Sequence, residues 1–311
     1  MPTAVVDQAL SREAQPPGLD LRAKFGLAVV CLVAGVAPLA ARSIADDVAR
    51  ISYGLLVAAA FLAFTVFARN VSTLRQFWEL SFAFFVFALV QVLNNSIPGY
   101  VGTAILHDPP SAGNPLASTV SGTVVIQLLG TLIAIVPIIV LTRLSGRGLA
   151  SVYACRGKVG TWLAFPLVFF VVFCVFTATV ALRPDSPAQR LLPTRGAVTL
   201  DRFLALTPAL LLVAFSNGFE EEFLFRGLFL QKYNAFFNAR VSNVLQAAIF
   251  SFAHAGVTYT PSALFFMLVV VFPLGLLLGY LMRASDGVAT PGIVHAALDI
   301  PIYLAFVSYV A

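Results

Sequence analysis

Apolar residues run along this chain in long stretches separated by shorter polar segments. A helix needs roughly 20 apolar residues to cross a bilayer, and nine stretches approach that length. They cover residues 25–41, 51–68, 77–93, 124–142, 162–182, 207–232, 243–258, 262–282 and 290–310. The pattern predicts an all-α fold, a polytopic transmembrane helical bundle of about 8–9 spans, eight if the short 243–258 segment does not cross. Two polar segments rich in Pro, Asn and Ser, 94–123 and 183–203, are predicted to be loops.

The composition agrees with a membrane protein and excludes an ordinary soluble domain. Hydrophobic residues make up 59% of the 311 residues and charged residues 11%, whereas a typical soluble domain has about 25% charged residues. The net charge of +5 fits basic residues gathered in cytoplasmic loops, so no nucleic-acid partner is expected. The three cysteines have no CxxC spacing, which removes both a disulfide framework and a thiolate metal site.

Basic residues divide unevenly between the two sides that nine spans would define. Six lie on the side opposite the N-terminus, namely Arg42, Arg50, Arg183, Arg190, Arg195 and Arg202. Twelve lie on the side of the N-terminus, namely Arg12, Arg22, Lys24, Arg69, Arg75, Arg143, Arg147, Arg156, Lys158, Lys232, Arg240 and Arg283. Cytoplasmic loops carry the excess of Lys and Arg. We therefore expect a cytoplasmic N-terminus, with residues 1–24 as a disordered polar tail.

Ionisable residues stand inside three of the predicted spans. They are Glu220, Glu221, Glu222, His254, His295 and Asp299. A charged side chain in hydrocarbon costs ~2.5 kcal/mol or more, so several of them in one chain indicate a functional site. At a rise of 1.5 Å per residue, Glu221, His254 and His295 fall roughly 8–16 Å from the cytoplasmic ends of their spans. We expect them to share one layer in the cytoplasmic half of the membrane.

The spacing of these residues indicates how they could pair. Glu222 and Arg226 are four residues apart with the acid first, the better order for an ion pair on a helix. That pairing would leave Glu221 free to face a cavity, where a desolvated carboxylate is a stronger base than in water. His295 and Asp299 are also four residues apart, so Asp299 could orient the imidazole, or both could donate to an oxyanion.

Two chemistries are open to this set. Glu221, His254 and His295 could ligate zinc, with water in an open position, although no HExxH pattern is present. Without a metal, Glu221 and His254 would hold and deprotonate water, while His295 and Asp299 stabilise the oxyanion. The residues alone do not decide between the two.

Other features of the chain point to packing as much as to chemistry. Glu79, near a span end, is expected to snorkel or to form a hydrogen bond. Gly275 and Gly279 form a GxxxG pattern that favours close helix packing. The tripeptide 216–218, Ser-Asn-Gly, could loosen the helix before the glutamates, admit water, or simply pack.

Three motifs, in this order, resemble the CPBP family of intramembrane proteases, which includes CAAX proteases and bacteriocin-processing enzymes. The family motifs EExxxR, FxxxH and HxxxN or HxxxD here read Glu221-Glu222…Arg226, Phe250…His254 and His295…Asp299. The resemblance covers about residues 160–310. Many family members carry Asn at the last position. Asp299 is a departure, because an Asp donates a hydrogen bond only when it is protonated.

The resemblance implies roles for these residues. Glu221 would activate water with His254 as its partner, and Glu222 and Arg226 would support them. His295 and Asp299 would polarise the scissile carbonyl or a metal. The family is often called a metalloprotease family, which keeps zinc as a candidate cofactor.

The resemblance also implies a division of the chain and a function. Residues 1–24 would be a cytosolic tail, 25–160 a set of N-terminal spans acting as scaffold or gate, and 161–311 the catalytic core. We expect an intramembrane endopeptidase that acts on membrane-associated peptides or proteins in the lipid bilayer. The excess of arginine over lysine is typical of a GC-rich genome, and we expect the protein in a bacterial inner (cytoplasmic) membrane. A proton-coupled transporter and a catalytically silent immunity or scaffold protein remain as alternatives.

Overall fold

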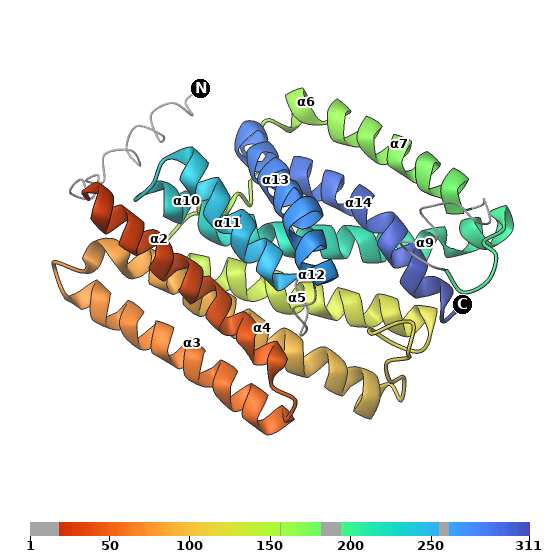
Figure 1. The fold of residues 1–311 in the computed structure, drawn as a ribbon, viewed down its shortest axis with the longest axis horizontal. Helices are drawn as coiled ribbons and strands as arrows, with labels where there is room; N and C mark the ends of the chain where they lie inside the picture. The colour runs from red at the N-terminus through yellow and green to blue at the C-terminus, as the bar shows by residue number, and fades with distance from the viewer. Residues whose placement is uncertain (1–18, 156, 182–193, 255–260) are drawn as a thin grey trace.

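The chain folds into a bundle of helices, most of which lie side by side (Figure 1). The structure is a computed structural model that describes residues 19–155, 157–181, 194–254 and 261–311. Within these ranges every regular element is helical and no strand occurs. The predicted all-α class is confirmed.

Seven helices in the described ranges are long and apolar enough to cross a membrane. They are Leu21–Ser43, Asp47–Asn70, Arg75–Ile105, Val120–Leu144, Leu200–Asn234, Leu264–Ser285 and Ala289–Ser308. An eighth apolar helix, Ala164–Thr179, is shorter. This agrees roughly with the predicted number of spans, and the protein is an integral membrane protein.

The N-terminal half contributes four long helices. They are α2 (Leu21–Val36), continued by the 3₁₀ helix η1 (Ala37–Ser43), α3 (Asp47–Asn70), α4 (Trp78–Tyr100, preceded by the 3₁₀ turn η2, Arg75–Phe77) and α5 (Val120–Leu144). Asp20, Asp46 and Thr119 cap α2, α3 and α5, each accepting a hydrogen bond from the N–H three residues later. Because of the cap at Asp20, the first helix begins at Leu21 and not at residue 25. Residues 1–18 of the predicted tail lie outside the described residues.

The first part of the predicted loop 94–123 is helical, so this boundary prediction is wrong. The helix α4 continues through Pro98 and then as the π-helical turn η3 (Val101–Ile105). Asn94 has a partner inside the bundle, because its side-chain amide donates to Glu220 Oε1 at 2.7 Å. A polar side chain that is hydrogen-bonded costs little to bury. Polarity therefore did not mark the end of this helix.

The C-terminal half contains shorter helices and interruptions. They are η4 (Leu149–Val152), α6 (Val159–Trp162), α7 (Ala164–Ala181), α9 (Leu200–Glu221), the π-helical turn η5 (Glu222–Gly227), α10 (Leu228–Asn234), α11 (Ala239–Ala253), α12 (Pro261–Phe266), the π-helical turn η6 (Met267–Val271), α13 (Phe272–Ser285) and α14 (Ala289–Ser308). Capped by Thr199, α9 begins inside the predicted loop 183–203. The predicted span 243–258 is a 15-residue helix that ends before His254, which is its C-cap. Residues 255–258 of that prediction lie outside the described part.

Two helix pairs approach closely at glycines. A Cβ added to Gly218 of α9 would lie 2.8 Å from the backbone nitrogen of Ala296 in α14, so the two backbones are in direct contact. A Cβ on Gly275 of α13 would lie 3.0 Å from the Cβ of Ala247 in α11. A Cβ on Gly279, also in α13, would overlap the side chain of Asn243 in α11. The predicted packing role of the GxxxG pattern is confirmed.

Aromatic side chains join the two halves of the bundle. The rings of Phe84 and Phe87 on α4 lie 5.1 and 5.5 Å from the ring of Phe229 on α10, and Phe87 also packs on Phe225 of η5. Figure 1 shows α2, α3 and α4 along one side of the bundle and α6 and α7 along the opposite side. The segment that carries the glutamates is thus packed directly on an N-terminal span. The predicted division at residue 160 stays a prediction.

Candidate active site

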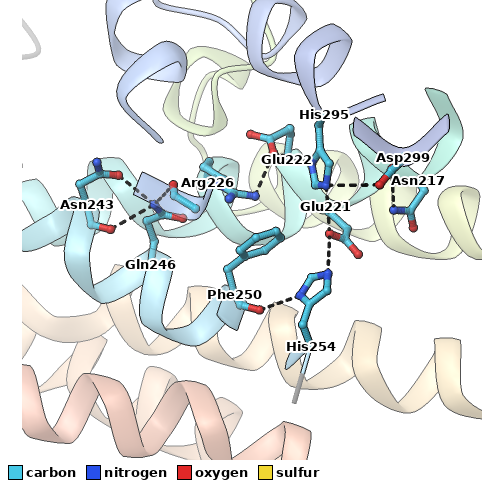
Figure 2. A network of polar contacts seen from close by, with 11 residues as sticks. Asn217, Glu221, Glu222, Arg226, Asn243, Gln246, Phe250, His254, His295 and Asp299 are labelled. Carbon is cyan, nitrogen blue, oxygen red and sulfur yellow. Dashed lines mark hydrogen bonds and ion pairs between the residues drawn. The ribbon is translucent and has the colours of Figure 1, made fainter. Parts of the chain in front are cut away.

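Glu221 lies between two imidazole rings (Figure 2). Its Oε2 is 3.6 Å from Nε2 of His254 and 3.5 Å from Nε2 of His295. Three elements supply these groups, namely the end of α9, the end of α11 and the middle of α14. Oε2 is buried and has no hydrogen-bond partner among the described residues, yet 31% of the His254 side chain is exposed. Both Nε2 atoms therefore face the same carboxylate oxygen of Glu221, and the His254 ring connects this point to the protein surface.

Glu222 points away from that oxygen and is fully buried. Its Oε1 accepts a hydrogen bond from Arg226 Nη1 at 2.8 Å and lies 2.9 Å from Nδ1 of His295. The predicted ion pair between Glu222 and Arg226 is present, and neither side chain is exposed. A carboxylate only accepts hydrogen bonds, so His295 Nδ1 carries the proton in this contact. Glu222, and not Asp299, is the carboxylate that orients the His295 ring.

The π-helical turn η5 begins at Glu222, directly after the last α-helical residue, Glu221. Neighbouring residues on an α-helix already point about 100° apart, and a π turn widens the helix at the point where it occurs. Glu221 and Glu222 thereby face different nitrogens of the His295 ring, Nε2 and Nδ1 respectively. Such π turns are frequent at functional sites.

Phe250 fills the space between the charged groups. Its ring centroid lies 4.0 Å from the guanidinium carbon of Arg226, a cation–π contact. The same ring packs on the imidazoles of His254 and His295, with centroids 4.5 and 5.8 Å apart. Phe250 is buried, so its apolar ring packs against all three polar side chains and helps to fix their positions.

Asp299 stands beside this set without a close contact to the imidazole. Its Oδ1 is 3.9 Å from Nε2 of His295, too far for a hydrogen bond. Its Oδ2 accepts a hydrogen bond at 3.0 Å from the side-chain amide of Asn217. Asn217 lies one helical turn before Glu221, a spacing that could have drawn attention to it.

His254 is held by backbone contacts at the end of α11. Its Nδ1 lies 2.9 Å from the carbonyl oxygen of Phe250. The carbonyl of Ala253, the last residue of α11, accepts a hydrogen bond from Arg42 Nη1 at 2.8 Å. Arg42 Nη2 donates to Gln91 at 2.9 Å. Arg42 was expected in a loop on the far side, but it lies on η1 and reaches the helix that carries His254. No local pattern in the sequence joins residues 211 positions apart.

Glu220, the first of the three glutamates, faces the N-terminal spans. Its carboxylate accepts hydrogen bonds from Asn94 of α4 at 2.7 Å, and from Gln127 and Thr131 of α5 at 3.1 Å each. These bonds satisfy both carboxylate oxygens on the side away from His254. The three consecutive acids thus have three different environments.

The metal prediction finds no support in the geometry. Glu221, His254 and His295 do come together, but no group of three or more His, Cys, Asp or Glu side chains in the described ranges is arranged so that it could hold a metal ion. The donor set therefore does not fit zinc as it stands, and we assign no step to a metal. Zinc dependence stays a prediction, which chelator treatment of active protein would test.

Comparison with known proteins identifies one related family. Residues 203–301 match the family model described as Type II CAAX prenyl endopeptidase Rce1-like. The matched segment runs from the start of α9 to the middle of α14 and includes all the residues of the three motifs. No curated protein and no solved structure matches the chain.

Proposed function

Because this chain belongs, through residues 203–301, to the CAAX protease family, we propose that it cleaves peptide bonds with a water molecule activated by Glu221. Its substrate would be a membrane-associated peptide or protein. One observation carries the proposal, which is the position of Glu221 Oε2 between the Nε2 atoms of His254 and His295, at 3.6 and 3.5 Å. A carboxylate and an imidazole that face the same small space can bind a water molecule and remove its proton.

The chemical steps follow from these positions. Glu221 takes a proton from the water as the water oxygen forms a bond to the carbonyl carbon of the substrate. His254 orients that water through Nε2, since its Nδ1 is held by the backbone. When the C–N bond breaks, Glu221 returns the proton to the leaving nitrogen, so the carboxylate ends each cycle in its starting form.

The negative charge of the tetrahedral intermediate requires a donor. His295 gives its Nδ1–H to Glu222, so in its protonated form it can donate from Nε2 to the oxyanion. Asp299 would supply negative charge beside that ring. The buried pair of Glu222 and Arg226, packed on Phe250, would hold the ring in place during the reaction.

The membrane would place the reaction near the lipid surface. We propose that the protein resides in a bacterial inner membrane with its N-terminus in the cytoplasm, as the distribution of Lys and Arg favours. The exposed edge of His254 would then admit substrate from the bilayer. The N-terminal spans would support the site through Arg42, which binds the end of the helix before His254.

Glu221→Gln tests the proposal. The purified wild type and the variant are placed in nanodiscs with a library of membrane-associated peptides, and products are identified by mass spectrometry in ¹⁸O-labelled water. We expect label in the new carboxyl group with the wild type, and a loss of roughly 10²–10⁴-fold in rate with the variant.

Glu220→Gln serves as the matched control, because it removes one acid from the same run without touching His254 or His295. Cleavage that survives Glu221→Gln would contradict the proposal. Proton-coupled flux without cleavage would favour a transporter, and substrate binding without cleavage would favour a scaffold protein.

A further inference from the structure

Asn217 is a polar residue of the site that none of the three motifs contains. It lies four residues before Glu221 on α9, so the two side chains share one face of that helix. Its side-chain amide donates to Asp299 Oδ2 at 3.0 Å (Figure 2). Asp299 is buried, and a buried carboxylate needs hydrogen-bond donors to remain charged.

The backbone next to Asn217 fixes how the two helices meet. A Cβ on the following residue, Gly218, would lie 2.8 Å from the nitrogen of Ala296 and 3.1 Å from the carbonyl oxygen of Gly292. Such a contact leaves no room for a side chain between α9 and α14 at this position, so the two backbones pack directly on each other. Asn217 and Asp299 are therefore held in register by backbone packing, and their hydrogen bond does not depend on a mobile side chain alone.

The bond to Asn217 leaves the other oxygen of Asp299 directed toward the site. Oδ1 is 3.9 Å from Nε2 of His295, the same nitrogen that faces Glu221. An amide carries no charge, so it satisfies one oxygen of Asp299 without cancelling the negative charge. A lysine or arginine at position 217 would bind the carboxylate and neutralise its effect on the His295 ring.

We propose that Asn217 is a positioning residue for the hydrolysis, fixing the Asp299 carboxylate so that Oδ1 faces His295 Nε2. The inference rests on the proposed function and extends it to a residue outside the three motifs. Many family members carry Asn where this chain has Asp299. Here the side-chain amide comes instead from Asn217 on α9, which is hydrogen-bonded to Asp299.

An exchange of the two side chains tests this role. Asn217→Asp alone places two carboxylates against each other, and we expect kcat to fall roughly 10- to 100-fold with little change in KM, the scale of effect that a small misplacement produces. The double variant N217D/D299N restores an amide-to-carboxylate hydrogen bond in the opposite direction, keeps the single negative charge of the pair, and leaves the amide oxygen of residue 299 toward His295. We expect it to recover most of the lost kcat.

Thr207→Val is the matched control on the same helix. Thr207 donates its hydroxyl to the carbonyl of Phe203, so the variant removes a polar group from α9 far from the site. We expect no change in kcat. Thermal unfolding of every variant in nanodiscs separates loss of fold from loss of rate.

Two results would overturn the inference. The first is an Asn217→Asp variant that folds and has wild-type kcat, and the second is an exchanged variant no faster than Asn217→Asp. If either occurs while Glu221→Gln is inactive, only the role of Asn217 is wrong. If Glu221→Gln is active, the proposed hydrolysis itself is wrong, whatever the Asn217 variants do.

Discussion

His295 Nδ1 lies 2.9 Å from Glu222 Oε1, the same oxygen that accepts a hydrogen bond from Arg226. One carboxylate oxygen thus connects an imidazole of the site to a guanidinium that has no exposed surface. The first prediction concerns this shared oxygen. Glu222→Gln should lower the cleavage rate at least 10-fold, because the His295 ring loses its charged acceptor, and should destabilise the fold by about 3 kcal/mol, because the charge of Arg226 stays buried and unpaired.

Thermal unfolding and peptide cleavage, measured on the same nanodisc preparation, check both effects. The control is Glu79→Gln, which breaks a partly exposed ion pair between Glu79, near the start of α4, and Arg147, just beyond the end of α5. That variant should cost less than about 1 kcal/mol and leave cleavage unchanged. Equal effects of the two variants on cleavage would show that Glu222 has no special role.

The second prediction concerns Glu220. Glu220→Gln should change the cleavage rate by less than about 5-fold and stability by about 1 kcal/mol. The reason is that its hydrogen bonds go to Asn94, Gln127 and Thr131 and not to the histidines. The same cleavage assay compares it with Glu221→Gln and Glu222→Gln. An inactive but folded Glu220→Gln variant would mean that the site extends toward α4 and α5.

Arg42 provides the third prediction. Arg42→Ala should reduce kcat about 10-fold, because the carbonyl before His254 loses its donor and the ring loses a fixed position. Arg42→Lys should retain part of the activity, since one of the two hydrogen bonds can be replaced. Arg75→Ala is a suitable control, because Arg75 donates to the carbonyl of Arg69 at 3.3 Å, at the end of α3 that is remote from η1. A rate for Arg42→Ala equal to that of Arg75→Ala would contradict the expected effect.

Asp108 gives a prediction about acid stability. Its carboxylate accepts hydrogen bonds from the backbone N–H of Ser118 and from the hydroxyls of Ser118 and Thr119, and these bonds lower its pKa from the usual value. A carboxyl with a lowered folded pKa stabilises the fold above its unfolded pKa of about 3.9, and loses that effect as the pH falls through the folded value.

Asp108→Ala should therefore destabilise the protein by about 1–3 kcal/mol at neutral pH, with the difference from wild type shrinking below about pH 4. Unfolding temperatures measured from pH 3 to pH 8 check this. A difference that stays constant into acid would mean that the hydroxyl contacts of Asp108 do not depend on its charge. Peptide cleavage at neutral pH should be unaffected in the folded variant.

Several features of the fold could be predicted because they are local. Long apolar runs predict membrane helices, and the four-residue spacing of Glu222 and Arg226 predicts their ion pair. The agreement in depth of Glu221, His254 and His295 also anticipated their meeting at 3.5–3.6 Å. Each of these inferences depends on the geometry of a single helix or on the thickness of the bilayer.

Other features depend on contacts between distant segments. Polar composition suggested a loop at Asn94, but a hydrogen bond to Glu220 keeps that residue in a helix. The i and i+4 spacing suggested that Asp299 orients His295, but the ring is hydrogen-bonded to Glu222 at 2.9 Å, while Asp299 is 3.9 Å away. Arg42 was counted as an exposed loop charge, and its bond to Ala253 depends on how η1 docks against α11. No periodicity within a helix reports such pairings.

The hydrogen bond from Arg42 to the last carbonyl of α11 has a practical consequence for anyone who wishes to shorten this protein. The family match begins at residue 203, so a fragment that starts there would retain every acid and imidazole of the candidate site. It would lack the guanidinium that terminates the His254 helix and the amides that satisfy Glu220. A minimal enzyme engineered from this chain should therefore keep the first four membrane helices, or include equivalents of Arg42, Asn94 and Gln127 from another scaffold.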